Sequence, residues 1–486
     1  MTALPRSTPS AEGVDSAAVT RFLDSLTAAG DIEVHSVMLL RHGAVVAEGH
    51  WAPYEAGQVN LLYSLSKSFT SVAAGIAMQE KRFRLDDRIV DLVPELVPGD
   101  VADTWRRVTV RDCLRMATGH LDDPEIHPGG GDWLAAFLRL APEREPGSVF
   151  TYNQLATYTV ARLIEASSGE RLLDYLRPRL FEPLGIGAAA WFTDGHGHDC
   201  GFSGLHVATD AIARLGQLLL QRGQWDGEQL LPADWVEQAT SRRMPNDGAH
   251  RRPGAEEPTF DWGHGYGFQF WMCRNGFRGD GAYGQFCLVL PEQDSVLAMT
   301  AETTQMQAVL DAVWEHLLPG LGSGGSEEAD TDLATRLENA AVVIPASDGT
   351  SRGTGRLARS GGDAAPSVDA VEIAAAASGW IAHLRAGDRS WQLPIGNRDW
   401  AEGEWMDDPG VPFRSAGGWV DGRFRAQLRM IRTPHVIELE ADPEAGTVGL
   451  QWREQPLHGT EPAAHSSDPS GARVRSSRPR VAGSEP

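Results

Sequence analysis

The chain has 486 residues, of which 43 are basic and 66 acidic, so its net charge is -23. This charge disfavours binding to nucleic acids and to anionic membrane surfaces, and we expect neither partner. The length leaves room for two or three domains with a large apolar core.

The N-terminus and the cysteines carry little sign of export or of metal binding. Residues 1–13 lack the charged start and apolar segment of a signal peptide, and no apolar run approaches the length of a transmembrane helix. We therefore expect a cytoplasmic protein. The cysteines form no CxxC pair, so we expect buried thiols, with no disulfide framework and no metal or other cofactor. They are Cys113, Cys200, Cys273 and Cys287.

The first predicted elements are a helix, a hairpin and a second helix. Apolar residues recur at helical spacing from Asp15 to about Gly30, where a glycine ends the pattern. Residues 37–46 hold two apolar segments around a turn, which predicts two antiparallel strands. A largely buried helix is predicted over the residues that follow Ser64, ending near Gln79.

Helical patterns dominate the middle of the chain, and strands return after it. The helical segments are residues 110–116, 132–140, 155–167, 209–221 and 232–240. Strand-like segments lie at residues 266–273, 286–290 and 295–300, before a helix at residues 305–318. Strands at both ends of a helical region predict one sheet closed by distant segments, in an α+β arrangement of two lobes.

The last third of the chain has a different pattern. Residues 320–329 and 347–365 are rich in polar residues and glycine and are typical of linkers. Short alternations of apolar and polar residues then predict an all-β barrel or sandwich. We therefore divide the chain into a first domain at residues 1–319, a linker at 320–366, an all-β domain at 367–458 and a disordered tail at 459–486.

Lysine is rare in this chain, and one of its two lysines follows a serine by three residues. Lys67 lies three residues after Ser64, and the other lysine is Lys81. In the first turn of a helix this spacing places both side chains on one face. Lysine, unlike arginine, can lose its proton when buried and deprotonate a serine. The alternative is a solvated lysine beside a helix-capping serine.

A second candidate segment precedes the helix predicted from residue 155. Tyr152 there could carry a proton between a serine, a lysine and a leaving group, while Asn153 or Gln154 could offer an amide to substrate or lysine. The alternative is a packed tyrosine with Asn153 as the helix cap.

A third candidate segment leads into the strand predicted from residue 286. Gly279, Asp280 and Gly281 precede Ala282, and this density of glycine permits close approach of a ligand to the backbone. An edge strand here could bind an acyl substrate, with the amide of Ala282 donating to an oxyanion. The alternative is a plain hairpin turn.

In this order the three segments resemble those of the serine hydrolases related to class C β-lactamases and penicillin-binding proteins. The resemblance spans residues 15–318 and includes residues 85–87, 116–120 and 291–292. It implies a β-lactamase/transpeptidase-like domain with an antiparallel sheet and a helical lobe, followed here by a small lipocalin-like all-β domain. It implies that Ser64 is acylated, that Lys67 is its base and that Tyr152 carries the proton. The amides of Ser64 and Ala282 would form the oxyanion hole.

Two departures from the family pattern bear on the substrate. The tyrosine motif has Gln154 at its third place, and the third motif has Gly279, Asp280 and Gly281 in place of a cationic motif. Asp280 should repel the carboxylate that penicillins and peptidoglycan stems carry, so an ester, amide or modified peptide fits better.

One loop offers a different chemistry. Residues 194–200 alternate histidines with carboxylates before a cysteine, which could indicate a metal site. Alternating residues in a glycine-containing loop point in different directions, so we expect no metal here. In the family this region lines the cleft, where His196 or His198 would touch substrate.

The resulting expectation is a metal-independent serine hydrolase that acts through an acyl-enzyme on a small or peptide-like acyl substrate. Two alternatives remain. The acyl group could pass to an amine or alcohol, as in a transferase or peptide cyclase, because acceptor binding and water exclusion decide that outcome. A binding protein that retains the fold is the other alternative.

Overall fold

The computed structural model describes residues 3–124, 131–246, 260–360, 367–405, 410–457 and 459–465. The chain forms two compact units. The first holds residues up to Ile344 together with the short segment Ile431–Val436. The second holds Pro345–Met430 and the described residues from Ile437 onward. Within the described ranges, no helix is long and apolar enough to cross a membrane.

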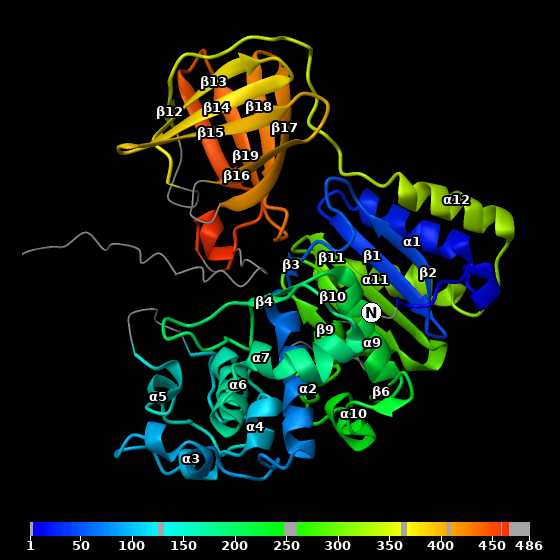
Figure 1. Cartoon of the computed structure of the whole chain (residues 1–486), viewed down its shortest axis with the longest axis vertical. Coiled ribbons are helices and arrows are strands. Elements are labelled where there is room, and N and C mark those ends of the chain that lie inside the picture. The colour runs from blue at the N-terminus through cyan, green and yellow to red at the C-terminus, as the bar shows by residue number, and fades with distance from the viewer. Residues whose placement is uncertain are drawn as a thin grey trace, which may run out of the picture. The chain divides into compact units, whose positions relative to one another are not determined.

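A six-stranded antiparallel sheet is the centre of the first unit (Figure 1). Its strand order is β2-β1-β11-β10-β9-β8. The strands are β1 (Glu33–Arg41), β2 (Ala44–His50), β8 (Trp271–Cys273), β9 (Gly276–Gly281), β10 (Gln285–Leu290) and β11 (Ser295–Glu302). Pairing of β1 with β11 confirms that segments from the two ends of this region close one sheet. The strand predicted at residues 266–273 is shorter than expected, because only its last three residues join the ladder.

Helices cover both faces of the sheet. Side chains alternate between the two faces along a strand, so neighbouring residues of β1 lie in different cores. In β1, Leu39 packs with α1 (Ser16–Ala28) and α11 (Met306–Ala312) in one core. Leu40 faces the opposite core, which contains α9 (Thr209–Leu220) and the helical lobe.

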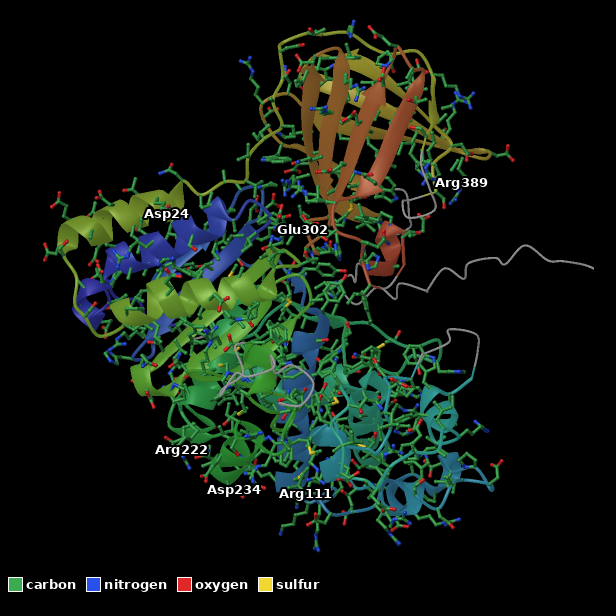
Figure 2. All side chains as sticks on the ribbon, turned by 180° about the vertical axis from the view of Figure 1, so that it is seen from behind. Asp24, Arg111, Arg222, Asp234, Glu302 and Arg389 are labelled. Carbon is green, nitrogen blue, oxygen red and sulfur yellow. The ribbon has the colours of Figure 1, made fainter. Side chains whose placement is uncertain are left out.

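The helical lobe lies between β2 and β8 in sequence. Its helices are α2 (Ser66–Gln79), α3 (Ile89–Leu92), α4 (Val110–Leu114), α5 (Trp133–Phe137), α6 (Gln154–Ser168), α7 (Leu172–Leu176), α8 (Glu182–Leu184) and α10 (Ala233–Ala239). Short strands complete it: β3 (Asn60–Leu61), β4 (Ala190–Trp191), β5 (Leu205–Val207), β6 (Gln224–Trp225) and β7 (Glu228–Gln229). Helix α2 is buried along nearly its whole length, as its apolar stripe predicted. Charged residues such as Arg222 and Asp234 lie on the exposed surface (Figure 2).

The segment expected to be a linker contains regular structure. Helix α12 (Glu327–Glu338) begins with a cap from Ser326 and buries Leu333 and Leu337 in the first unit. Its apolar stripe consists of few residues on an otherwise acidic helix, so composition alone indicated a linker. Residues 361–366 of the expected linker lie outside the described ranges.

The second unit is an eight-stranded barrel, so the all-β prediction is confirmed. Its strands are β12 (Leu357–Arg359), β13 (Ala370–Ala376), β14 (Gly379–Ala386), β15 (Arg389–Gly396), β17 (Val411–Val420), β18 (Arg423–Arg429), β19 (Val436–Asp442) and β20 (Thr447–Trp452). Pairing of β15 with β17 closes the ring, and β16 (Ala401–Trp405) adds to β17. Trp380, Trp405 and Trp419 fill its core. Of the expected disordered tail, residues 459–465 are described and include a short helical turn, while residues 466–486 lie outside the described ranges.

Candidate active site

Ser64 lies in a short 3-10 turn, Tyr63–Leu65, directly before α2. The side-chain hydroxyl of Ser64 caps neither the turn nor the helix, since neither element has a side-chain cap. The turn is joined to strand β5, because the backbone N–H of Leu62 donates to Leu205 O at 2.8 Å. Ser64 is therefore free of the capping role that the sequence left open.

Lys67 is buried in the first turn of α2 and its amine has three contacts. Nζ lies 3.1 Å from Ser64 Oγ, 2.6 Å from Gln154 Oε1 and 2.9 Å from Phe202 O. Only 1% of the residue is exposed, so it is not the solvated lysine of the alternative interpretation. The contact with the backbone of Phe202 was not anticipated, because a carbonyl has no sequence signature.

Burial lowers the pKa of Lys67 to about 7, while Asp123 and Asp280 partly oppose this shift. The neutral amine is thus well populated near neutral pH. Two of its contacts, the amide oxygen of Gln154 and the carbonyl of Phe202, can only accept hydrogen bonds. The two N–H groups of a neutral amine therefore go to them, and its lone pair is left for the Ser64 hydroxyl.

Asp123 orients the side chain of Gln154. The carboxylate accepts from the backbone N–H of Gln154 at 2.9 Å and also from its side-chain amide. The NH₂ end of the amide therefore points to Asp123, and its oxygen points to Lys67. Burial raises the pKa of Asp123, and Lys67 and Gln154 counter that shift. Sequence reasoning missed Asp123, although it closely follows the turn at residues 116–120.

Tyr152 lies over the lysine with its hydroxyl at Ser64. The Tyr152 ring centroid is 4.7 Å from Lys67 Nζ, and the ring stacks on Trp271 at 5.2 Å. Burial raises the pKa of Tyr152 well above its usual range; Asp280 adds to this, and a hydrogen bond with Ser64 counters it. The phenol accordingly holds its proton and is suited to donate it.

Asn153 is placed away from this group. Its side-chain Oδ1 accepts from Ala156 N at 3.1 Å and caps α6, and the residue is fully buried. Asn153 is therefore the helix cap of the alternative interpretation, and the side-chain amide that contacts Lys67 is that of Gln154.

The glycines of the third segment bring β9 against the Ser64 turn. A Cβ on Gly281 would lie 2.0 Å from Leu62 O and 3.1 Å from Leu65 N, and one on Gly279 would lie 2.3 Å from Ser68 Oγ. Only glycine permits this approach. Strand β8 pairs with β9 only as far as Arg278. Residues Gly279–Gly281 of β9 are therefore not paired with β8. Ala282 follows and packs on the cluster of Leu61, Tyr63 and Tyr283.

Asp280 is paired, which changes the expected repulsion of carboxylates. Its carboxylate accepts from Arg278 Nε at 2.8 Å, and both side chains are buried. Arg278 lies over the Trp262 ring at 4.4 Å. The negative charge of Asp280 is thus largely balanced within the strand. The guanidinium is fully buried: Nε bonds Asp280 and Nη1 bonds the carbonyls of Asp261 and Met272, while Nη2 has no hydrogen-bond partner among the described residues.

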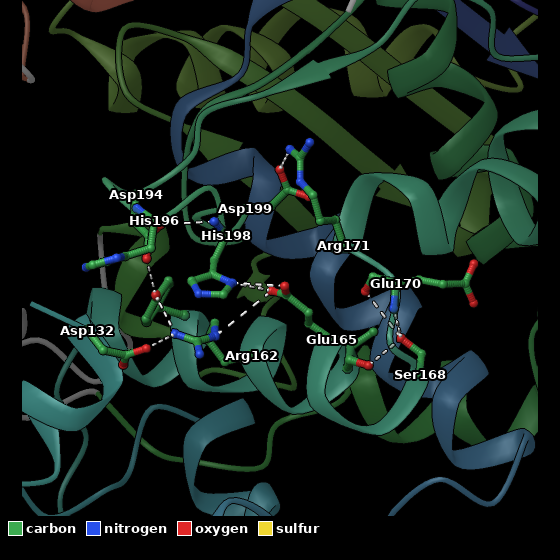
Figure 3. Close-up of polar contacts among 12 residues, drawn as sticks. Asp132, Arg162, Glu165, Ser168, Glu170, Arg171, Asp194, His196, His198 and Asp199 are labelled. Atoms are coloured by element: carbon green, nitrogen blue, oxygen red, sulfur yellow. Dashed lines mark hydrogen bonds and ion pairs between the residues drawn. The ribbon is translucent and has the colours of Figure 1, made fainter. Parts of the chain in front are cut away.

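The loop at residues 194–200 takes part in a network of polar contacts with α6, in which Arg162 contacts both Tyr158 and Glu165 (Figure 3). Asp194 accepts from Tyr158 Oη at 2.6 Å, and His198 Nδ1 lies 2.9 Å from Glu165. Asp199 pairs with Arg171, and His196 is exposed. In the part of the chain that the structure describes, no group of three or more histidine, cysteine or carboxylate side chains is arranged to hold a metal.

Comparison with known proteins places this geometry in a family. A family model described as Beta-lactamase matches residues 19–318. Penicillin-binding protein 4 of Amycolatopsis lactamdurans is 29% identical over 36% of this chain and 44% of its own length, so the match spans less than half of that protein. The 6-aminohexanoate-dimer hydrolase of Paenarthrobacter ureafaciens is 26% identical over 54% of this chain and 70% of its own length. The crystal structure of SurE with D-Leu shares the fold with a TM-score of 0.51 and 18% identity, over 87% of this chain and 98% of that one.

Proposed function

Because this chain belongs to the Beta-lactamase family, we propose that it is a serine hydrolase that cleaves an ester or amide bond through an acyl-enzyme on Ser64. One observation carries the proposal. Lys67 is a buried amine whose other two contacts accept hydrogen bonds, so that its lone pair is directed at Ser64 Oγ. A lysine with a pKa of about 7 is a competent general base at neutral pH.

In the proposed acylation step, Ser64 Oγ bonds to the substrate carbonyl carbon as its proton passes to Lys67 Nζ. The carbonyl oxygen then carries a negative charge. The backbone N–H groups of Ser64 and Ala282 would stabilise that charge, which is supported by the close approach of Gly281 to the Ser64 turn. Such donors contribute most to the rate because they meet charge that develops in the transition state.

Departure of the leaving group requires a proton, and Tyr152 is placed to supply it. The phenol gives its proton to the leaving nitrogen or oxygen and takes one from the Lys67 ammonium, so the balance of protons is kept. The raised pKa of Tyr152 supports this role, because a phenol that stays protonated is a donor and not a base. Water then attacks the acyl-enzyme: its oxygen bonds to the acyl carbon as its proton passes to the neutral Lys67 amine, and Ser64 Oγ leaves and regains a proton from the Lys67 ammonium.

The proposed substrate is an ester or amide that does not depend on a carboxylate beside the scissile bond. At the place of the family motif's cation this chain has Gly279, and the neighbouring Arg278 is buried and paired with Asp280. One relative is named 6-aminohexanoate-dimer hydrolase, and this name supports the proposal of a hydrolase.

The proposal is tested by pre-steady-state kinetics with p-nitrophenyl esters and p-nitroanilides, using the native chain and Ser64→Ala. We expect a burst of nitrophenol equal to the enzyme concentration, followed by slower turnover, and no burst from Ser64→Ala. Adding amines or alcohols as acceptors separates hydrolysis from acyl transfer by the products formed. Equal turnover by the native chain and Ser64→Ala would contradict the proposal.

A further inference from the structure

We propose that His435 is a positioning residue that fixes the two turns carrying the oxyanion-hole amides. The proposal rests on the acyl-enzyme function proposed above. His435 lies in the segment Ile431–Val436, which is part of the first unit although the chain on both sides belongs to the second. His435 thus follows the barrel strand β18 in sequence but belongs to the first unit, which also contains Ser64.

The segment is anchored in the first unit by its backbone. Leu61 N donates to Arg432 O at 2.9 Å, and Gln58 Nε2 donates to Ile431 O at 2.6 Å. At its other end, Val436 N donates to Glu302 Oε1 at 3.2 Å, where β11 ends. These bonds tie the segment to β3 and to the sheet, so His435 has a fixed place.

The His435 ring contacts two tyrosines at once. Its Nε2 lies 2.5 Å from Tyr63 Oη, and its ring packs edge-on against Tyr283 with centroids 4.6 Å apart. The rings of Tyr63 and Tyr283 also touch, at 5.1 Å. His435 is fully buried, so this three-ring cluster is shielded from water. Edge-on aromatic contacts and a buried hydrogen bond restrict both tyrosines more than either does alone.

Both tyrosines have backbone conformations that need such support. Tyr63 has φ of 47° and Tyr283 has φ of 67°, which bulky residues adopt only when the surroundings hold them. Tyr63 directly precedes Ser64, so its ψ angle orients the Ser64 N–H. Tyr283 directly follows Ala282, the other proposed donor. Releasing either ring would let the corresponding turn relax and misdirect an amide.

The Beta-lactamase family model ends at residue 318, so His435 lies outside the matched region. The segment Ile431–Val436 therefore adds a positioning residue to the first unit from beyond the matched region, and no motif in the sequence indicates it. His435 acts on the oxyanion hole through Tyr63 and Tyr283, and for that reason we describe it as positioning and not as catalytic.

The test compares His435→Ala, His435→Gln and Tyr63→Phe in the full chain, with His465→Ala as a matched control. His465 is also a buried histidine, but it lies in the second unit. For each variant, kcat and KM on a p-nitrophenyl ester, the inhibition constant of an alkyl boronic acid, and Tm are measured. The boronic acid forms a tetrahedral adduct on Ser64 and so reports the oxyanion hole.

For His435→Ala we expect kcat to fall about tenfold or more, less than the 10²–10³ that loss of a whole donor costs. KM should change little, and the boronic acid should bind more weakly by the same factor as kcat/KM falls. His435→Gln should restore part of the loss, because its amide can still bond Tyr63. Tyr63→Phe should lose part of kcat and should not add fully to His435→Ala.

Unchanged kcat and boronic acid affinity in His435→Ala would overturn the proposal, as would a loss that His465→Ala reproduces. If His435→Ala does not fold, Tyr63→Phe decides, since it removes only the hydroxyl. Labelling of native Ser64 by a fluorophosphonate separates the two proposals: failure of labelling overturns the acyl-enzyme function, whereas labelling with no effect of His435 overturns only this inference.

Discussion

Lys67 and Gln154 are joined by a hydrogen bond of 2.6 Å, in which the amide oxygen of the glutamine faces the amine. The glutamine is held in that orientation by Asp123, which takes its NH₂ end. A flipped amide would present N–H groups to the lysine and compete with Ser64 for its lone pair. Asp123 therefore influences the hydrogen bonding of Lys67, the proposed base, through Gln154.

Catalysis should depend on the deprotonation of Lys67. Its pKa is lowered to about 7, and the base form exists above that value. We expect kcat/KM for a p-nitrophenyl ester to rise with pH and to level off above an inflection at about 7. An inflection near the ordinary lysine value of 10.5 would contradict the lowered pKa of Lys67.

Asp123→Asn should shift this inflection to lower pH. The carboxylate raises the pKa of Lys67, so removing its charge lets burial lower the pKa further. We also expect a lower plateau of kcat, because asparagine no longer selects one orientation of Gln154. Asp234→Asn, at an exposed position in α10, is the matched control and should leave the profile unchanged. A profile that moves to higher pH in Asp123→Asn would contradict the assignment.

Tyr152→Phe should separate substrates by their leaving groups. An anilide or alkylamide needs a proton on its departing nitrogen, so we expect hydrolysis of these amides to fall by about 10²–10⁴. p-Nitrophenolate departs without a proton, and acylation by its ester should fall far less. The ratio of the two rates, measured by stopped-flow, is the readout. Equal losses on both substrates would argue against proton donation by Tyr152.

Asp280→Ala should destabilise the fold because it leaves Arg278 buried and unpaired. We expect a loss of about 3–5 kcal/mol in the free energy of unfolding of the first unit, measured by urea denaturation. Replacing both residues, Arg278→Met with Asp280→Leu, should recover much of that loss. Asp91→Ala, which breaks an exposed pair with Arg88, is the control and should cost less than about 1 kcal/mol. Equal stability of Asp280→Ala and the native chain would contradict the pairing.

The contacts that the sequence predicted are those that depend on short spacing. Ser64 and Lys67 share the start of one helix, and their separation of three residues was enough to place them together. The pairing of Arg278 with Asp280 follows a similar rule, since residues two apart in a strand face the same side. The sequence therefore contains a signal for this pairing, which differs from the expectation that Asp280 is an uncompensated charge.

Other parts of the site depend on tertiary contacts that no local pattern contains. Asp123 reaches Gln154 across a loop, and the carbonyl of Phe202 reaches Lys67 from a segment 135 residues further along the chain. Asn153 caps α6 and Gln154 contacts Lys67 because α6 begins at Gln154. Sequence patterns place the start of a helix only to within a few residues. Helix α12 has too narrow an apolar stripe to be distinguished from a polar linker.

The acylation of Ser64 is tested most directly by a fluorophosphonate, in which Ser64 Oγ bonds to phosphorus as fluoride leaves. Intact mass and peptide mapping should show one adduct, on Ser64, with none in Ser64→Ala. Lys67→Met should label at least about 10²-fold more slowly, while Lys81→Met, at the exposed second lysine, should label at the native rate. Absence of an adduct in the native chain, or an adduct on another residue, would contradict the account.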